Sequence, residues 1–313
     1  MTRAPGAARQ PYSRLTLGTA QLGMDYGITN TLGRPSDAEA LSIVASALEG
    51  GIAQLDTARA YGDAELRLGR MLGRWPAGRV RIMSKLAPLT ELPEAAPPAQ
   101  VCAAVDRSVE ASCRDLACTR IDVMMLHRST DMFHWAGAAL ERLSEHVARG
   151  RIGELGVSVY TPAEAVRALD DRRITQLQIP FNLLDQRWLA PEFQGAVAAR
   201  PELKVHARSI FLQGLLLSEA ARWPAWAEAA PALCAEIRRL VGSCGRGCAA
   251  DLCIAFVQAF PWITSLVVGV ASAAQLRELL ALAHEAPLSA AQAAGVRDAF
   301  RGVSARLLNP TLW

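Results

Sequence analysis

The segment Ile121-Asp122-Val123-Met124-Met125-Leu126-His127 decides the fold, because it is a short apolar run that ends at an ionisable residue and precedes a stretch of helical periodicity over residues 136–149. The same order of a strand-like run and a helix-like stretch recurs along the chain, which is typical of βα units in a parallel sheet. Eight runs have the strand pattern, at residues 14–17, 51–55, 80–84, 121–126, 152–157, 175–179, 203–207 and 265–268. Expected helices lie at residues 36–49, 64–72, 101–116, 136–149, 162–169 and 273–283, and three of them begin after the capping residues Ser36, Thr161 and Ser272.

Eight such units predict an α/β fold, a single-domain (β/α)8 TIM barrel, with about 39 residues per unit in the 313-residue chain. The alternative is an open, doubly wound sheet, which normally carries a G-x-G-x-x-G turn after its first strand. Here the first run leads into Gly18-Thr19-Ala20-Gln21-Leu22-Gly23, which lacks that spacing. We therefore expect residues 14–313 to form the barrel and residues 1–13 to be a flexible N-terminus.

The composition narrows the class of partner. The net charge is +3, from 33 basic and 30 acidic residues, which argues against nucleic acid as a partner. The first twelve residues contain no apolar run of signal-peptide length, and no eighteen consecutive residues are apolar, so we expect no membrane association. Seven irregularly spaced cysteines indicate reduced thiols and a cytoplasmic protein. The segment Cys244-Gly245-Arg246-Gly247-Cys248 matches no common zinc pattern and is interpreted as a turn between helices.

Four ionisable residues follow three consecutive strand-like runs. Asp56, Lys85 and His127 end these runs, and Tyr61 follows Asp56 in the next loop, so a barrel would bring all four to the mouth where active sites lie. Singly, they could be a helix cap, an extended surface lysine, a core histidine and a turn residue. Together they favour catalysis, because burying an aspartate and a lysine is costly unless the two pair. Lys85 would then lower the pKa of Tyr61, Asp56 would keep Lys85 charged, and His127 would orient a carbonyl oxygen.

These residues and their neighbours resemble the aldo-keto reductase family, whose members are NAD(P)H-dependent barrels with an Asp, Tyr, Lys and His tetrad. The matching segments are residues 55–65, 84–86, 124–127, 156–158, 178–182 and 269–276, and the similarity runs from about residue 14 to residue 283. The resemblance implies hydride transfer from nicotinamide C4 to a carbonyl carbon while Tyr61 protonates the oxygen, without a metal. The reverse oxidation would use the same groups.

The resemblance also implies a set of cofactor contacts. Ser158 and Gln178 would hold the nicotinamide carboxamide near Asn182, and the remaining contacts would come from Gly18, Thr19, Ala20, Arg208, Ser209, Phe211, Gly214, Gly269, Val270, Ser272 and Gln275. Arg208 replaces a tyrosine that stacks on the nicotinamide in many members, so it could cover the nicotinamide, reach the pyrophosphate, or pair with an acidic neighbour. The stretch 269–276 contains no cation that would meet a 2′-phosphate, which leaves NADH, NADPH or dual use open.

Substrate contacts are expected from the loops over the barrel mouth. Tyr26 lies in one loop, Phe133 and Trp135 could form an apolar wall, and Arg128 could meet an anionic or hydroxylated substrate, although each could equally be a surface residue. The segments 18–23 and 208–214 are similar to bacterial family members associated with sugar metabolism, which suggests a sugar-derived aldehyde or ketone. The alternative function is a cofactor-binding regulatory or interaction protein on the same barrel.

Overall fold

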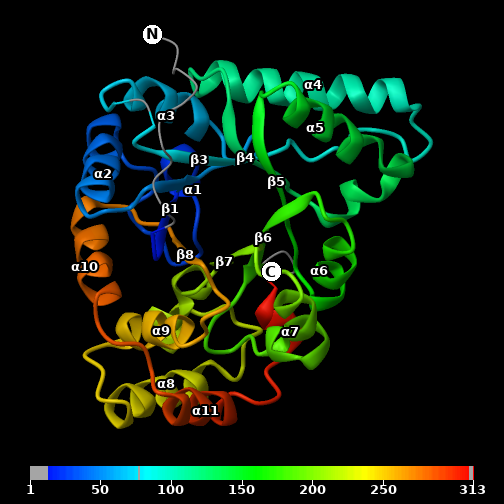
Figure 1. The fold of residues 1–313 in the computed structure, drawn as a ribbon. Helices are drawn as coiled ribbons and strands as arrows, with labels where there is room; N and C mark the ends of the chain where they lie inside the picture. The colour runs from blue at the N-terminus through cyan, green and yellow to red at the C-terminus, as the bar shows by residue number, and fades with distance from the viewer. Residues whose placement is uncertain (1–12, 77, 310–312) are drawn as a thin grey trace.

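Eight parallel strands close into a barrel in the order of the sequence, with β8 hydrogen-bonded back to β1. The computed structural model describes residues 13–76, 78–309 and 313. Helices surround the strands on the outside (Figure 1). The predicted (β/α)8 barrel is therefore confirmed and the doubly wound sheet is wrong. The flexible segment predicted for residues 1–13 falls, except for Ser13, outside the described residues.

The bounds of the elements are as follows. The strands are β1 (Leu15–Gly18), β2 (Gln54–Asp56), β3 (Arg81–Lys85), β4 (Ile121–Leu126), β5 (Ile152–Ser158), β6 (Ile174–Pro180), β7 (Lys204–Arg208) and β8 (Ser265–Val268). The α-helices are α1 (Ala20–Gly23), α2 (Asp37–Glu49), α3 (Ala64–Leu72), α4 (Pro98–Asp115), α5 (Ala138–Ala148), α6 (Pro162–Leu169), α7 (Pro191–Ala198), α8 (Ala230–Ser243), α9 (Ala249–Gln258), α10 (Ala273–Ala283), α11 (Ala290–Ala299) and α12 (Ala305–Leu308). Short 3₁₀ helices are η1 (Ser129–Met132), η2 (His134–Gly137), η3 (Arg187–Leu189), η4 (Leu212–Leu217) and η5 (Ala220–Arg222).

The predicted cap residues act as expected. Ser36, Thr161 and Ser272 each accept a hydrogen bond from the backbone N–H three residues later, at the start of α2, α6 and α10. Two helix starts differ from their predictions by two or more residues: α4, expected from residue 101, begins at Pro98, and α5 begins after residue 136. The helix expected from residue 136 begins at Ala138, because Trp135 and Ala136 both have φ of +51° and cannot belong to a right-handed helix.

Alternation along the strands separates two apolar regions. Leu55, Ile82 and Met124 face outward into the large core between the barrel and its helices. Met83, Val123 and Met125 face inward and form a small separate cluster inside the barrel. Because side chains alternate along a strand, the inward positions that follow at the carboxyl ends of β2 and β3 are Asp56 and Lys85. The same alternation that fills the barrel therefore aims these two groups into its mouth.

Within the described ranges, no helix combines the length and the apolar character needed to cross a membrane.

Candidate active site

A buried ion pair forms the base of the site. Lys85 Nζ lies 2.8 Å from both Asp56 carboxylate oxygens and donates a further hydrogen bond of 3.0 Å to Thr57 O. The Lys85 and Asp56 side chains are only 1% and 4% exposed. Gln178, from β6, donates to Asp56 Oδ1 at 2.8 Å. The cost of burying both charges is therefore offset by direct pairing and by two further polar contacts.

Tyr61 lies over this pair on the loop that follows β2. Lys85 Nζ is 4.8 Å from the centroid of the Tyr61 ring, and the His127 ring meets Tyr61 edge-on with centroids 5.8 Å apart. Arg59 anchors the loop, because its backbone N–H donates to Lys85 O at 3.2 Å and its guanidinium contacts Glu65. The four residues predicted to be catalytic are thus brought together at one end of the barrel.

Burial decides the protonation of these groups. It raises the pKa of Tyr61 above 10, and Lys85 opposes this shift without reversing it, so the expectation of a lowered tyrosine pKa is wrong in its net direction. Burial alone would lower the pKa of Lys85, but Asp56 and Tyr61 outweigh it and the lysine pKa is raised. Burial, Lys85 and Arg208 lower the pKa of His127 to about 3. At neutral pH the site therefore holds a phenol, an ammonium and a neutral imidazole.

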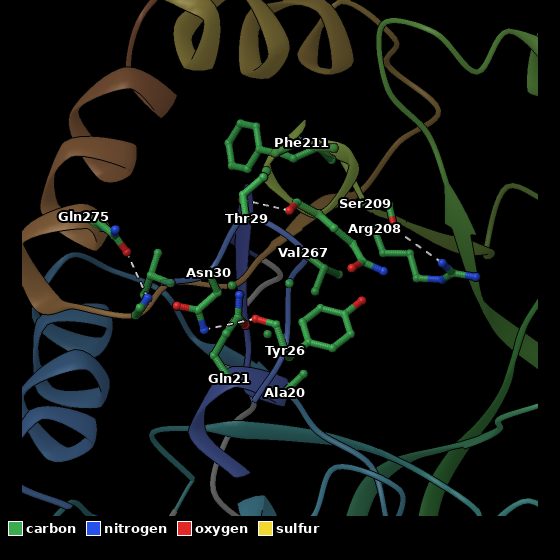
Figure 2. A pocket seen from close by; sticks show the side chains of 18 of the residues that line it. Ala20, Gln21, Tyr26, Thr29, Asn30, Arg208, Ser209, Phe211, Val267 and Gln275 are labelled. Carbon is green, nitrogen blue, oxygen red and sulfur yellow. Dashed lines mark hydrogen bonds between the residues drawn. The ribbon is translucent and has the colours of Figure 1, made fainter. Parts of the chain in front are cut away.

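A cavity of about 480 Å³ opens beside Asp56 and Tyr61 (Figure 2). It extends from these residues past the carboxyl ends of β1, β7 and β8 to Gln275 and Leu279 on α10. The predicted cofactor residues that line it are Gly18, Thr19, Ala20, Gln178, Arg208, Ser209, Phe211, Gly214, Gly269, Val270 and Gln275. A long ligand could lie here with one end at the tetrad.

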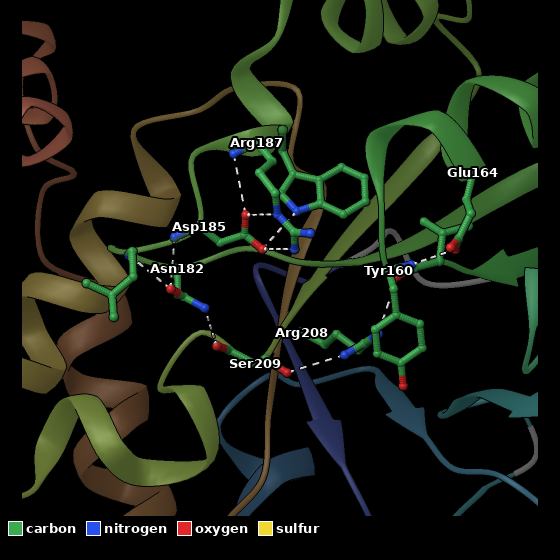
Figure 3. A network of polar contacts seen from close by, with 10 residues as sticks. Tyr160, Glu164, Asn182, Asp185, Arg187, Arg208 and Ser209 are labelled. Carbon is green, nitrogen blue, oxygen red and sulfur yellow. Dashed lines mark hydrogen bonds and ion pairs between the residues drawn. The ribbon is translucent and has the colours of Figure 1, made fainter. Parts of the chain in front are cut away.

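Three predicted cofactor residues do not line this cavity. Ser158 is buried at the end of β5 opposite Gln178. Asn182 donates to Ser209 O at 3.1 Å, and its own oxygen accepts from two backbone N–H groups, so it holds the segment after β7 in place (Figure 3). Ser272 caps α10.

The cavity has features that fit a dinucleotide. Gln178 Oε1 is buried and has no hydrogen-bond partner among the described residues, although the Gln178 amide nitrogen donates to Asp56. A buried acceptor left unpaired is costly and invites a donor from a ligand. Gly18 and Gly269 expose backbone at the cavity wall, and a Cβ at Gly269 would lie only 2.2 Å from Gln21 Oε1. The end of the Gln21 side chain thus fills the space beside Gly269, and neither glycine contributes a side chain to the wall.

Arg208 lines the cavity as a cation that forms no ion pair with any described residue. Its guanidinium donates to Val159 O at 3.3 Å and to Ser209 Oγ at 3.4 Å, and lies 4.4 Å from the Tyr160 ring centroid (Figure 3). The acidic neighbour considered in the sequence analysis is thus not its partner here. Tyr160, which supports the guanidinium, was missed because nothing in its sequence context distinguishes it from a loop residue.

Two loops meet across the cavity. Thr29 Oγ1, after β1, donates to Gln213 O, after β7, at 3.1 Å (Figure 2). Gly214 has φ of +90°, and a Cβ there would lie 2.0 Å from Thr29 Oγ1, so only glycine fits the contact. The two residues are 184 positions apart, and no sequence pattern predicts their contact.

The predicted substrate residues are only partly assembled. Tyr26 lines the cavity and is 36% exposed, and burial of its phenol raises its pKa. Phe133 lies under the Arg167 guanidinium at 3.7 Å, and Trp135 donates to Pro93 O at 2.8 Å. Arg128 immediately precedes η1 and does not line the cavity either. The predicted apolar wall is therefore engaged in contacts within the protein.

One carboxylate, that of Glu278, lines the far end of the cavity, and a second, that of Glu39, lies at the start of α10. Glu39, in the first turn of α2, accepts a hydrogen bond of 2.7 Å from Ala273 N at the start of α10. Glu278 lines the cavity, whereas Arg277 donates to Ser46 at 3.4 Å and is not part of the lining. Sequence reasoning missed Glu39 because the contact joins residues 234 positions apart.

The segment containing Cys244 and Cys248 connects α8, which ends at Ser243, to α9, which begins at Ala249. The predicted turn between helices is confirmed.

Comparison with known proteins places the barrel in a family. The model of the aldo/keto reductase family matches residues 14–300. A solved structure described as an aldo-keto reductase from Pseudomonas aeruginosa is similar with a TM-score of 0.63 and 23% identity, covering 87% of this chain and 90% of that one. An aldo-keto reductase from Bacillus halodurans, in its holo form, gives a TM-score of 0.73 and 21% identity, covering 92% of each chain. No curated protein sequence matches significantly.

Proposed function

Because the chain belongs to the aldo/keto reductase family, we propose that it reduces an aldehyde or ketone to an alcohol with NADH or NADPH. The observation that carries this proposal is the buried Asp56–Lys85 pair beneath Tyr61, with a neutral His127 at the edge of the ring.

In this proposal the cofactor, when bound, would supply the hydride, and a side chain of the protein would donate the proton. Tyr61 is protonated at neutral pH because of its raised pKa, and it donates its proton to the carbonyl oxygen. Lys85 stabilises the phenolate that remains, and Asp56 holds Lys85 in the charged form. A neutral His127 carries one N–H, which can hydrogen-bond the carbonyl oxygen without adding charge.

The cofactor would be held by the cavity wall. Gln178 Oε1 can accept from the nicotinamide carboxamide, together with Ser158 on the neighbouring strand. Arg208 can cover the nicotinamide or reach the pyrophosphate with its unpaired charge, and Ser209 and Gly214 follow it along the wall.

We further propose that NADH is bound at least as well as NADPH. The stretch after β8 would meet a 2′-phosphate, and there the Glu39 carboxylate already occupies the N-terminus of α10, where an anion would otherwise be stabilised. Glu278 adds a second negative charge, and Arg277 is directed to α2. A phosphate at this end would meet the Glu278 carboxylate and no cation of the lining, and Glu39 would already hold the first backbone N–H of α10.

The carbonyl substrate is proposed to be sugar-derived and small. Tyr26, Tyr160 and Arg208 place hydroxyl and guanidinium groups near the tetrad, which suits hydroxylated molecules. Phe133 and Trp135 make no contribution to this proposal, because other contacts hold them.

The test of the reaction is a turnover screen of aldehydes, ketones and sugars with each cofactor, comparing the wild type with Tyr61→Phe. The variant should keep cofactor binding and lose about 10²-fold or more in kcat, the usual scale for a general acid. Full activity of Tyr61→Phe would exclude the mechanism. Cofactor binding without turnover of any substrate would favour the alternative of a regulatory protein.

The test of cofactor choice is a fluorescence titration that measures the Kd of NADH and of NADPH. Glu39→Gln should tighten NADPH by about 2- to 5-fold, the scale of one charge at a helix N-terminus, and leave NADH nearly unchanged. Glu49→Gln, at the other end of α2, is the matched control. A large NADPH preference in the wild type that survives Arg277→Ala would refute the proposal.

A further inference from the structure

The carboxyl end of α4 brings two cysteines together. Cys118 N donates to Cys113 O at 2.9 Å, and Ala117 N donates to Arg114 O at 3.1 Å. Ala117 has φ of +50°. This pair of bonds around one left-handed residue is the Schellman motif, in which the side chains at the two ends of the motif meet. Here both ends are cysteines.

The two thiols differ in exposure. Cys113 is 8% exposed, whereas Cys118 is partly exposed and packs against the edge of the core. The Cys118 thiol and the Arg151 guanidinium stabilise the Cys113 thiolate and lower the pKa of Cys113 to about 7. A substantial fraction of Cys113 is therefore the nucleophilic thiolate at neutral pH.

We propose that Cys113 and Cys118 form a reversible disulfide when the protein meets a peroxide. A disulfide requires closely spaced α-carbons and side chains that point toward each other. The 2.9 Å hydrogen bond between the backbones of these residues brings their α-carbons close, and the Cys118 side chain lies within hydrogen-bonding reach of the Cys113 thiol.

The chemistry balances with hydrogen peroxide as the oxidant. One thiolate sulfur attacks a peroxide oxygen, the O–O bond breaks, and a sulfenic acid and water result after protonation. The second thiolate then attacks the sulfenic sulfur, the S–O bond breaks, and a second water leaves as the S–S bond forms. The two thiols lose two electrons and two protons, and the peroxide is reduced to two waters.

The pair lies close to the catalytic loop. Ser112, next to Cys113, donates to Glu65 at 3.2 Å, and Asp115 accepts from Arg59 at 2.6 Å. These contacts join the end of α4 to the loop that carries Tyr61. The disulfide could form whether or not the chain reduces carbonyl compounds, because its test detects the S–S bond itself and does not measure turnover.

Trypsin makes the test direct, because Arg114 lies between the two cysteines. Cleavage after Arg107, Arg114 and Arg120 places Cys113 in the peptide 108–114 and Cys118 in the peptide 115–120, each with one cysteine. The folded protein is treated with hydrogen peroxide, the remaining thiols are alkylated, and the digest is analysed without reduction. We expect these two peptides to appear linked as the main disulfide product, with two of the seven thiols lost and regained on adding dithiothreitol.

The controls separate this pair from general oxidation. Cys118→Ser should abolish the linked peptide, and Cys248→Ser, at an exposed position, should leave its yield unchanged. The proposal is overturned if both peptides remain separate and alkylated, or if pairs among the other five cysteines form as readily.

Discussion

The barrel holds two polar clusters, one toward each end of its strands, that are built from the same four kinds of side chain. Each contains a carboxylate, a cation, a glutamine and a histidine. The mouth cluster consists of Asp56, Lys85, Gln178 and His127, and the base cluster of Glu154, Arg81, Gln176 and His206. In each, the cation pairs with the carboxylate, at 2.8 Å in the mouth and 3.3 Å in the base. In each, the glutamine also donates to that carboxylate, at 2.8 and 2.6 Å.

The clusters differ in whether the glutamine side-chain oxygen has a hydrogen-bond partner. In the base cluster, Gln176 Oε1 is hydrogen-bonded with His206 Nε2 at 2.8 Å. In the mouth cluster, Gln178 Oε1 has no hydrogen-bond partner among the described residues, and a cavity opens beside Gln178. Burial lowers the pKa of both histidines to about 3, so a perturbed pKa does not distinguish the two clusters. The unpaired Gln178 Oε1 beside the cavity is what distinguishes the mouth cluster from the base cluster.

The largest contrast should appear in stability when each carboxylate is neutralised. Asp56→Asn leaves Lys85 buried without its counter-charge and should lower the free energy of unfolding by about 3–5 kcal/mol. Glu154→Gln should cost about 1 kcal/mol or less, because the Glu154 side chain is 31% exposed and water screens its pair. Urea denaturation of both variants measures the difference. Equal losses would mean that the two ion pairs are equivalent.

The next contrast concerns turnover. His127→Leu should reduce kcat/KM by about 10²-fold, since it removes the neutral hydrogen-bond donor beside Tyr61. His206→Gln should leave kcat/KM nearly unchanged, because His206 lies inside the barrel away from the cavity. Steady-state kinetics on the best substrate of the screen checks both. A comparable loss in His206→Gln would show that the base cluster shapes the site.

The smallest contrast is in pH dependence. The pKa of His206 is about 3 in the folded protein and about 6.5 in the unfolded chain, so below pH 6.5 protons bind preferentially to the unfolded state. Stability is therefore present above pH 6.5 and is lost as the pH falls toward 3, by about 1.4 kcal/mol per pH unit for this group.

His206→Gln should accordingly flatten the decline in unfolding free energy between pH 6.5 and 4.5 by about 2 kcal/mol. His127→Gln should flatten it by a similar amount, because the pKa of His127 is also lowered to about 3. Urea midpoints at the two pH values provide the measurement. An unchanged slope in His206→Gln would show that this histidine is protonated in the folded state.

Three residues of the mouth cluster were predictable because they end apolar strands. Asp56, Lys85 and His127 each stand where a parallel strand meets the barrel mouth, so strand boundaries alone bring them together. The register of the barrel follows from the same alternation. The base cluster gave no comparable signal, because Arg81 and Gln176 belong to strands. There the sequence shows that a side chain is polar but not which residue it will hydrogen-bond or pair with.

The rest of the site depends on contacts between distant segments. Glu39 on α2 contacts the start of α10, and Thr29 contacts Gln213. Local periodicity in the sequence predicts neither contact. The predicted wall of Phe133 and Trp135 was misplaced for the same reason. Positive φ at Trp135 turns the chain, and its indole bonds to Pro93 O instead of lining the cavity.

The bond between Thr29 and Gln213 has a consequence for the timing of the reaction. A long ligand beneath the two loops can exchange freely only after they part, so its residence time depends on how often the loops open as well as on how tightly it is held. The oxidised cofactor would then leave at a rate set by the opening of the two loops. In that regime, a variant with faster chemistry at Tyr61 would gain little overall speed, whereas one with a looser crossing would turn over faster while binding more weakly.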